Sequence, residues 1–389
     1  MELKPIQLFQ PTYEIDACLD EIRECLECGW TGLGFKTIQF EKAWSEYTGL
    51  THSHFVASNT AGLQLALRVL KDEGKWMAGD EVITTPLTFI SSNHMIVAEG
   101  LKPIFADIDE SLCLDPISVA KCITSRTRAV MFVGMGGNAG QLNAIKKLCD
   151  TLGVSLILDA AHMAGTHLNG QHVGQGCAAT VFSFQAVKNL PTADSGMVCF
   201  DSAMHDKQVR KLSWMGINRD TYSRSGTGGT YSWYYDVESV GYKAHGNSVM
   251  AAIGLVQLKV LDRDNARRRK LAKRYQEKLS SASGIEFIPV TKGCESSQHL
   301  VQIRVPAQYR DPLMASLAES KIFCGVHYRL NTHYSMYQYG LGKSPMAEKI
   351  EPELLSLPCH LRLSDEDIDR VCDQILSFFE KQRVQSKAA

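Results

Sequence analysis

The sequence lacks a net charge of either sign: across 389 residues, 41 lysines and arginines face 42 aspartates and glutamates. Without such an excess, no overall field favours nucleic acid or an anionic membrane surface. The sequence also lacks an apolar stretch long enough to span a bilayer, and its first residues contain no apolar signal core. We therefore expect a cytoplasmic protein whose partners are small molecules or a second copy of the chain, not nucleic acid or membrane.

The 12 cysteines lack the spacing of a metal site. Cys25 and Cys28 form a C-x-x-C pair, but no second pair or suitably spaced histidine motif completes a zinc set. Together with Cys18 they also fit one face of a predicted helix over 15–28. We expect reduced, mostly buried thiols and no bound metal.

What the chain does contain, between residues 50 and 200, is an alternation of short β-rich runs and helical runs. This order is typical of an α/β fold with a mostly parallel sheet, whose ligands gather beyond the carboxyl ends of the strands. A change of pattern near residue 250 predicts a large domain over 1–250 and a smaller one over 251–389. A polar, glycine-rich stretch, 219–229, is predicted to be a loop over the site. The predicted strands are 82–85, 103–107, 129–133, 155–159 and 180–184, and the predicted helices between them are 60–71, 89–99, 117–123 and 142–152.

Lys188 follows the apolar run Val181-Phe-Ser-Phe-Gln-Ala-Val and has no charged neighbour. An amine that must react with a cofactor aldehyde has to be partly uncharged, which a setting of this kind favours. Lys188 could therefore carry pyridoxal phosphate. The alternative is a lysine whose stem lies along the strand end while its amine reaches solvent.

Three further segments contain side chains that suit the same cofactor. Ser58-Asn-Thr-Ala61 precedes an amphipathic helix, so its backbone N–H groups could bind a phosphate, or Ser58 could be an ordinary helix cap. Asp159 ends an apolar strand and could keep a ring nitrogen protonated, with His162 three residues later near the ring. Phe89 could stack on a flat ring, although a lone phenylalanine is commonly part of a core.

A competing pattern lies between two predicted strands. Gly134, Gly136 and Ala139 match G-x-G-x-x-A after a strand, and Asp159 ends the next strand, as in dinucleotide-binding folds. Taken alone, this pattern predicts an NAD-dependent oxidoreductase. It leaves Ser183 and Lys188 without a role.

Together these segments make the chain resemble the DegT/StrS sugar aminotransferases, a fold-type I family that uses pyridoxal phosphate. The resemblance covers nearly the whole chain, with seven segments in the family's order. They are Gly29-Trp-Thr-Gly-Leu-Gly34, Gly79-Asp-Glu-Val-Ile-Thr-Thr-Pro-Leu-Thr-Phe89, Asp159-Ala-Ala-His162, Phe182-Ser-Phe-Gln-Ala-Val-Lys-Asn189, Ala251-Ala-Ile-Gly-Leu-Val-Gln-Leu258, Gly325-Val-His-Tyr-Arg329 and Leu355-Ser-Leu-Pro-Cys-His360.

The resemblance implies a role for each matching residue. It implies a seven-stranded sheet in the large domain, an α+β small domain, Lys188 as the cofactor-binding catalytic lysine, and a homodimer with shared active sites. The remaining cofactor-binding positions would be Thr60, Ala61, Phe89, Asp159, His162 and Ser183, with Lys243 reaching the phosphate of a neighbouring subunit, and the substrate-binding positions would be Trp30, Thr31, His327, Tyr328 and Arg329.

The resemblance is greatest to enzymes like the lipid A 4-amino-4-deoxy-arabinose aminotransferase, which share Ala-Ala-His, Gly-Tyr-Lys and His-aromatic-Arg. It implies transfer of an amino group from L-glutamate to a keto sugar, in particular a nucleotide-linked 4-keto sugar of amino-sugar or surface-polysaccharide synthesis. Two segments, Ala193-Asp-Ser-Gly196 and Ala244-His-Gly-Asn-Ser248, depart from the family pattern and bear on sugar specificity. A keto-sugar dehydratase is the alternative within the family, although such relatives have histidine at the position of Lys188. A cofactor-binding protein without turnover is another.

Overall fold

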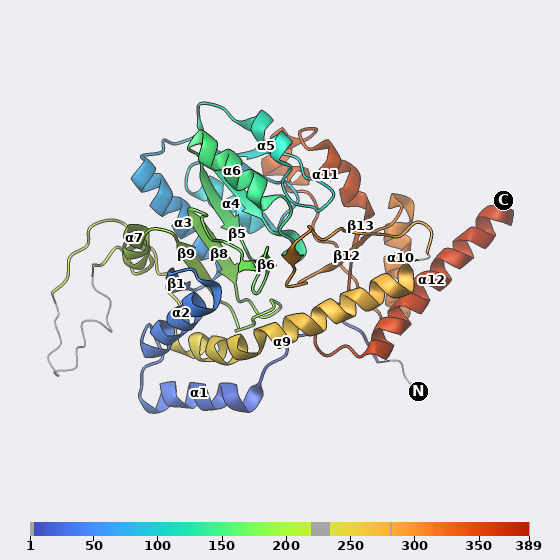
Figure 1. Cartoon of the computed structure of the whole chain (residues 1–389), viewed down its shortest axis with the longest axis horizontal. Helices are drawn as coiled ribbons and strands as arrows, with labels where there is room; N and C mark the ends of the chain where they lie inside the picture. The colour runs from blue at the N-terminus through green and yellow to red at the C-terminus, as the bar shows by residue number, and fades with distance from the viewer. Residues whose placement is uncertain (1–3, 219–233, 281, 389) are drawn as a thin grey trace.

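The computed structural model describes residues 4–218, 234–280 and 282–388, so the predicted loop over 219–229 lies outside the described residues. A seven-stranded sheet forms the centre of the molecule (Figure 1). Six of its strands run parallel, and β9 runs antiparallel between β1 and β8. In spatial order the strands are β1 (His52–Val56), β9 (Gly196–Phe200), β8 (Ala179–Ser183), β5 (Ser155–Asp159), β4 (Thr127–Val133), β2 (Glu81–Thr84) and β3 (Lys102–Phe105).

The strands are apolar because both faces of the sheet are covered. In β4, Val130 and Phe132 belong to one buried cluster, while Ala129 and Met131 belong to another on the opposite face. This alternation follows from the two-residue period of a strand. Helices α2 (Phe35–Thr48), α5 (Pro116–Cys122), α6 (Leu142–Leu152) and the first half of α9 (Ser248–Leu279) supply the first cluster, and α3 (Asn59–Gly74), α4 (Ile90–Ala98) and α7 (Ala203–Ser213) supply the second.

The predicted α/β class with a mostly parallel sheet is confirmed, as are the five predicted strands and four predicted helices, with ends displaced by a few residues. Strands β1 and β9 were missed. The first contains His52, Ser53 and His54, so it lacks the continuous apolar run of a buried strand, whereas the second has only four apolar residues after its initial glycine, the shortest run that indicates such a strand. The two strands are far apart in the chain yet pair with one another.

Helix α1 (Ile15–Glu27) corrects the prediction for the cysteines. Cys18 and Cys25 are buried against α9, as expected, but Cys28 lies beyond the end of the helix and is exposed. Among the described residues, no group of His, Cys, Asp or Glu side chains is arranged to hold a metal ion. No helix in the described ranges is both long and apolar enough to cross a membrane.

A second, smaller core lies toward the C-terminus. It packs a sheet of β10 (Glu286–Phe287), β12 (Val301–Arg304) and β13 (Leu354–Leu357) against α10 (Ala307–Glu319), α12 (Asp365–Ala388) and the last turns of α9. Figure 1 shows α9 passing beneath the central sheet from α1 to α12. Ala251 and Leu261 of this helix belong to the first core, and Leu271 and Tyr275 to the second. A domain division at residue 250 remains a proposal.

The remaining elements are short. They are β6 (His167–Leu168), β7 (Gln171–His172), β10 (Glu286–Phe287), β11 (Cys294–Glu295), β12 (Val301–Arg304), β13 (Leu354–Leu357), α11 (Pro345–Ile350), η1 (Met135–Gly137), η2 (Asn331–His333), η3 (Ser335–Gly340) and η4 (Glu351–Glu353).

Candidate active site

A cavity of about 460 Å³ opens at the carboxyl edge of the central sheet. Residues just after β1, β2, β5 and β8 line it, because parallel strands bring their carboxyl ends to one edge. The structure thus brings together eight of the predicted site residues, which are Thr60, Phe89, Asp159, His162, Ser183, Lys188, His327 and Tyr328.

Lys188 faces this cavity from the turn after β8. Its backbone N–H donates to the carbonyl oxygen of Gln185, which keeps the residue close to the strand end. Burial of its amine lowers the pKa of Lys188 to about 8, although the charge of Asp159 acts in the opposite direction. Near neutral pH a useful fraction of the amine is therefore uncharged, as a nucleophile or proton acceptor requires.

Asp159, at the end of β5, is held by three donors. Its Oδ2 accepts a 2.7 Å hydrogen bond from Ser92, and its Oδ1 accepts from the backbone of Ala161 at 3.2 Å and from Asn59 at 3.4 Å. Burial raises the pKa of Asp159, and these hydrogen bonds and the charge of Lys188 offset part of that rise. A cationic N–H donor placed in the cavity would favour the ionised carboxylate further.

His162 is held in one tautomer. The backbone N–H of Gly136 can only donate, so the Nδ1 atom of His162, at 3.2 Å, must accept. Burial and then the positive charge of Lys188 lower the pKa of His162 well below its usual range, so the ring is neutral. The proton therefore resides on Nε2, which lies 3.2 Å from the hydroxyl of Tyr328.

The start of α3 presents a helix N-terminus to the cavity. Ser58 caps the helix, as the conservative interpretation predicted: its Oγ accepts from the backbone N–H of Ala61. Thr60 lines the cavity, whereas Ala61 does not. Gly62 lets the helix approach the sheet, because a Cβ there would lie 2.6 Å from Val181. The helix start and Ser183 line the same cavity, and a helix N-terminus in such a position can bind an anion.

Phe89 is not part of the core. Its side chain is 57% exposed, lies at the start of α4 and faces the cavity. Its ring centroid is 6.0 Å from that of Tyr328. An exposed aromatic ring at this position is suited to stacking on a flat ligand.

Besides Ala61, four predicted site residues lie outside this cavity in the single chain. Trp30 and Thr31 are in the connection between α1 and α2, where the Thr31 carbonyl accepts from the backbone of Ser248 at 3.1 Å. The Nζ atom of Lys243 lies 3.3 Å from the centre of the Trp214 ring. Arg329 is exposed and lies over the ring of Tyr334.

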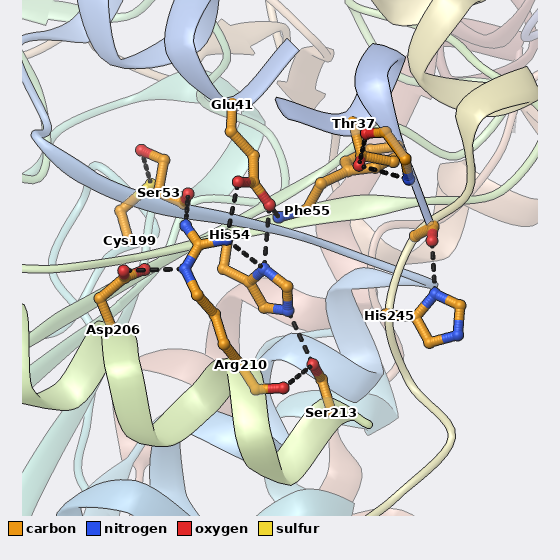
Figure 2. A network of polar contacts seen from close by, with 12 residues as sticks. Thr37, Glu41, Ser53, His54, Phe55, Cys199, Asp206, Arg210, Ser213 and His245 are labelled. Carbon is orange, nitrogen blue, oxygen red and sulfur yellow. Dashed lines mark hydrogen bonds and ion pairs between the residues drawn. The ribbon is translucent and has the colours of Figure 1, made fainter. Parts of the chain in front are cut away.

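A buried polar network fixes β1, the strand that leads to Ser58 (Figure 2). Oε1 of Glu41 accepts from the backbone of Phe55 at 2.8 Å and lies 2.9 Å from Nδ1 of His54. Arg210 of α7 donates to Oε2 of Glu41 at 2.8 Å and to the carbonyl of Ser53 at 2.9 Å. These contacts join α2, β1 and α7, so the approach of the chain to the cavity is rigidly defined.

The glycine-rich segment does not support dinucleotide binding. The backbone N–H of Gly134 donates to the Asp159 carbonyl, and that of Gly136 donates to His162. The segment is buried, and α6 begins only at Leu142. Its donors are thus engaged within the protein and are not directed at a pyrophosphate, which removes the basis of the oxidoreductase alternative.

Sequence reasoning missed several residues that hold the predicted ones. Asn59 and Ser92 bond to Asp159, and Gln185 and Asp194 line the cavity. Asn59 lies inside the Ser58–Ala61 segment that the sequence had already indicated, so its place in that segment could have marked it as a site residue. Ser92 had no such signal, because a serine in the first turn of a helix commonly caps it.

The side chains and the helix N-terminus that line this cavity fit pyridoxal phosphate. The N-terminus of α3 with Thr60 and Ser183 would hold its phosphate, Asp159 would hold its ring nitrogen, and Phe89 would cover one ring face. The amine of Lys188 would meet its aldehyde. Each group of the cofactor thus has a chemically matched partner along one cavity.

Comparison with known proteins agrees with this fit. Residues 13–376 match the model of the DegT/DnrJ/EryC1/StrS aminotransferase family. The spore coat polysaccharide biosynthesis protein SpsC of Bacillus subtilis (strain 168) is 36% identical over 367 residues, which cover 92% of this chain and 93% of SpsC.

Two solved structures confirm the fold-type I aminotransferase fold. The aminotransferase TlmJ from Streptoalloteichus hindustanus superposes with a TM-score of 0.89 at 32% identity, over 97% of this chain and 100% of TlmJ. Spr1654 from Streptococcus pneumoniae, described as a sugar aminotransferase, gives a TM-score of 0.88 at 28% identity in its PMP form, over 99% and 100% of the two chains, and has also been solved in a PLP form. The chain therefore belongs to the DegT/DnrJ/EryC1/StrS aminotransferase family, whose members depend on pyridoxal phosphate.

Proposed function

We propose that the protein transfers the amino group of L-glutamate to a nucleotide-linked keto sugar in the synthesis of a surface polysaccharide. The observation that carries the proposal is the pairing, in one cavity, of an amine of lowered pKa on Lys188 with the buried carboxylate of Asp159. Similarity to SpsC, a spore coat polysaccharide biosynthesis protein, supports the polysaccharide context. Resemblance to the lipid A aminotransferases supports a 4-keto sugar. A cytoplasmic location remains a prediction.

When bound, pyridoxal phosphate supplies an aldehyde for the amino group and a ring that withdraws electrons from the adjacent carbon. The Lys188 amine takes up the proton that leaves Cα of the amino donor, because its lowered pKa makes it a competent base. Asp159 would keep the ring nitrogen protonated, since its own hydrogen bonds orient it and its burial strengthens the interaction. The same amine would then deliver that proton to the cofactor carbon that receives the amino group, and in the second half of the reaction it would move a proton in reverse, from this carbon to the acceptor carbon.

The absorption spectrum of the purified protein tests the cofactor and the donor. We expect a visible band that is lost when L-glutamate is added, and no glutamate response of this kind in Lys188→Ala. A band that persists with L-glutamate but is lost with another amino acid would reject the donor and retain the reaction class. Product analysis with nucleotide-linked 4-keto sugars, sugar phosphates and free keto sugars then tests the acceptor.

A keto-sugar dehydratase remains the second candidate within the family. The presence of Lys188 disfavours this reaction, because a dehydratase has no need of a lysine amine that binds the cofactor again after each turnover. Loss of water from a keto sugar without consumption of glutamate would establish it.

We also propose a homodimer in which Lys243 serves the phosphate of the neighbouring subunit. Its position outside the cavity of its own chain supports this, as does its place in the family pattern. Mixing inactive Lys188→Ala and Lys243→Ala proteins tests it. Mixed dimers should regain activity in one of their two sites, whereas a lysine that serves its own chain would give no recovery.

A further inference from the structure

His299 is a buried histidine that no predicted role includes. Its side chain is 2% exposed, and its ring contacts two others. The Phe9 ring is stacked on one face at a centroid distance of 5.6 Å and an angle of 10°, and the His162 ring lies 4.4 Å away at 33°. His299 is thus in direct contact with a residue that lines the active-site cavity.

The residue after Lys188 is in contact with the same histidine. Nδ2 of Asn189 donates to Oδ1 of Asn265 and to the carbonyl of Ser297, both at 2.7 Å. Asn265 in turn donates to the carbonyl of Ala164 at 2.9 Å, which fixes the orientation of both amides. Oδ1 of Asn189 therefore faces Nδ1 of His299 at 2.9 Å, and Nδ1 must carry the proton of that hydrogen bond.

The segment containing His299 also holds the loop after β5. Oγ of Ser297 donates to the backbone carbonyl of His162 at 2.6 Å, and the backbone N–H of Ser297 donates to Thr166 at 3.1 Å. Residues 297–299 are therefore attached both to the loop of His162 and to the segment of Lys188. These loops follow neighbouring strands, β5 and β8, and the contacts fix the distance between them.

We propose that His299 is a positioning residue: through Asn189 it holds the segment that carries Lys188, and through its ring it holds His162 with Nε2–H toward Tyr328. The inference rests on the roles proposed above for Lys188 and His162. It assigns the two functions of His299 to different parts of the side chain. The Nδ1–H group anchors the lysine segment, and the flat face supports the imidazole of His162.

The chemistry of the position agrees with such a role. Burial, followed by the positive charge of Lys188, lowers the pKa of His299 well below its usual range. The ring therefore remains neutral and places no second cation beside the lysine amine. Because the ring is neutral, it can donate a hydrogen bond to the Lys188 segment and pack against His162 without disfavouring protonation of either residue.

Two substitutions separate the two functions. His299→Asn keeps an N–H donor close to the place of Nδ1 and removes the ring. His299→Phe keeps a flat ring and removes the donor. Each is measured in the cofactor-free protein, so that the result does not depend on the identity of the substrate or on turnover.

The first measurement is the rate at which Lys188 reacts with acetic anhydride over a range of pH, followed by mass spectrometry of the Lys188 peptide. We expect His299→Phe to lower the rate at pH 7 by about tenfold, equivalent to a rise of one unit in the pKa of an amine that is less firmly held in its buried position. His299→Asn should stay within about twofold of the parent, because its donor is retained. The same result for both substitutions would contradict an anchor that depends on the Nδ1–H group.

The second measurement is the ¹⁵N spectrum of the histidine rings, with His162 assigned by means of His162→Gln. The parent and His299→Phe should show one tautomer of His162, protonated on Nε2, and His299→Asn should show a mixture. Unchanged signals and unchanged Lys188 rates in two folded variants would overturn the proposal. If His299→Phe does not fold, Asn189→Ala removes the same hydrogen bond from its other end and should produce the same change in Lys188. Failure of the aminotransferase assay alone would bear on the proposed function and not on this positioning role.

Discussion

The hydroxyl of Ser92 donates a 2.7 Å hydrogen bond to Oδ2 of Asp159. Both side chains are buried, and Ser92 also lies 3.0 Å from Oγ1 of Thr88, so the serine is held in place from two sides. The carboxylate proposed to meet the ring nitrogen therefore has a defined direction. This contact links α4 to the end of β5 and makes the orientation of Asp159 testable.

Substitution of Ser92 by alanine should weaken cofactor binding. Loss of one hydrogen bond to a buried carboxylate costs about 1–3 kcal/mol, so we expect the dissociation constant of pyridoxal phosphate to rise about tenfold or more. Titration of the cofactor-free protein measures this. Ser91→Ala is the control, because Ser91 lies next in the same helix and has no hydrogen bond to Asp159 in the structure. An equal loss in both variants would argue against a specific role for the Ser92 contact.

Removal of the Lys188 amine should stabilise the cofactor-free protein. The folded pKa of about 8 is lower than the ordinary value, so below pH 8 the folded state binds its proton less readily than the unfolded state does. Lys188→Met should raise the free energy of unfolding at pH 7 by about 2 kcal/mol, less than the full shift implies because the cavity admits solvent. The gain should shrink as pH rises from 8 toward 10.5. Denaturant titrations at pH 7 and 9 measure it, and a gain that is equal at both values would contradict the lowered pKa.

Glu41 should stabilise the fold in a pH-dependent way. Burial alone would raise its pKa, but the hydrogen bond and charge of His54 and the charge of Arg210 outweigh that effect and lower it. A lowered folded pKa gives stability that is present above the unfolded pKa, near 4.3, and is lost as pH falls through the folded value. We expect Glu41→Gln to cost about 2 kcal/mol at pH 7, since Arg210 is partly exposed, and less at pH 4.

Glu46→Gln is the matched control for this experiment. Glu46 is in the same helix and pairs with Lys42, but both side chains are exposed. Its substitution should leave the free energy of unfolding almost unchanged at either pH. Equal effects of the two substitutions would show that the buried network in Figure 2 contributes no more than a surface pair.

Phe89 should affect the cofactor and not the fold. Its side chain is largely exposed, so Phe89→Leu should leave the melting temperature of the cofactor-free protein nearly unchanged. Loss of ring stacking is worth about 1 kcal/mol, which predicts about fivefold weaker binding of pyridoxal phosphate. A large drop in melting temperature with unchanged cofactor affinity would instead place Phe89 in the core.

The sequence predicted the elements whose signal is local. Residues 129–133 and 155–159 are apolar throughout because both faces of the sheet are covered, and that pattern can be read without knowing the partners. β1 could not be found in this way, because the polar side chains of Ser53 and His54 are satisfied by residues of β9, α2 and α7. Its environment is set by tertiary contacts.

The same distinction applies to the site. Lys188, Asp159 and Phe89 lie near strand ends, where sequence pattern and chemistry coincide. His299 could not be identified, because the residues that give it meaning, Asn189 and His162, are 110 and 137 positions earlier in the chain. A buried histidine has no sequence signature of its own. Only the folded chain shows which loops it joins.

The continuous helix α9 has a thermodynamic consequence. Its early turns complete the core beneath the central sheet, and its later turns complete the C-terminal core. Loss of either core would expose apolar side chains on the same 32-residue helix and remove packing that supports its other half. The two cores should therefore melt in a single cooperative transition, with the cofactor cavity and the C-terminal region lost at the same temperature.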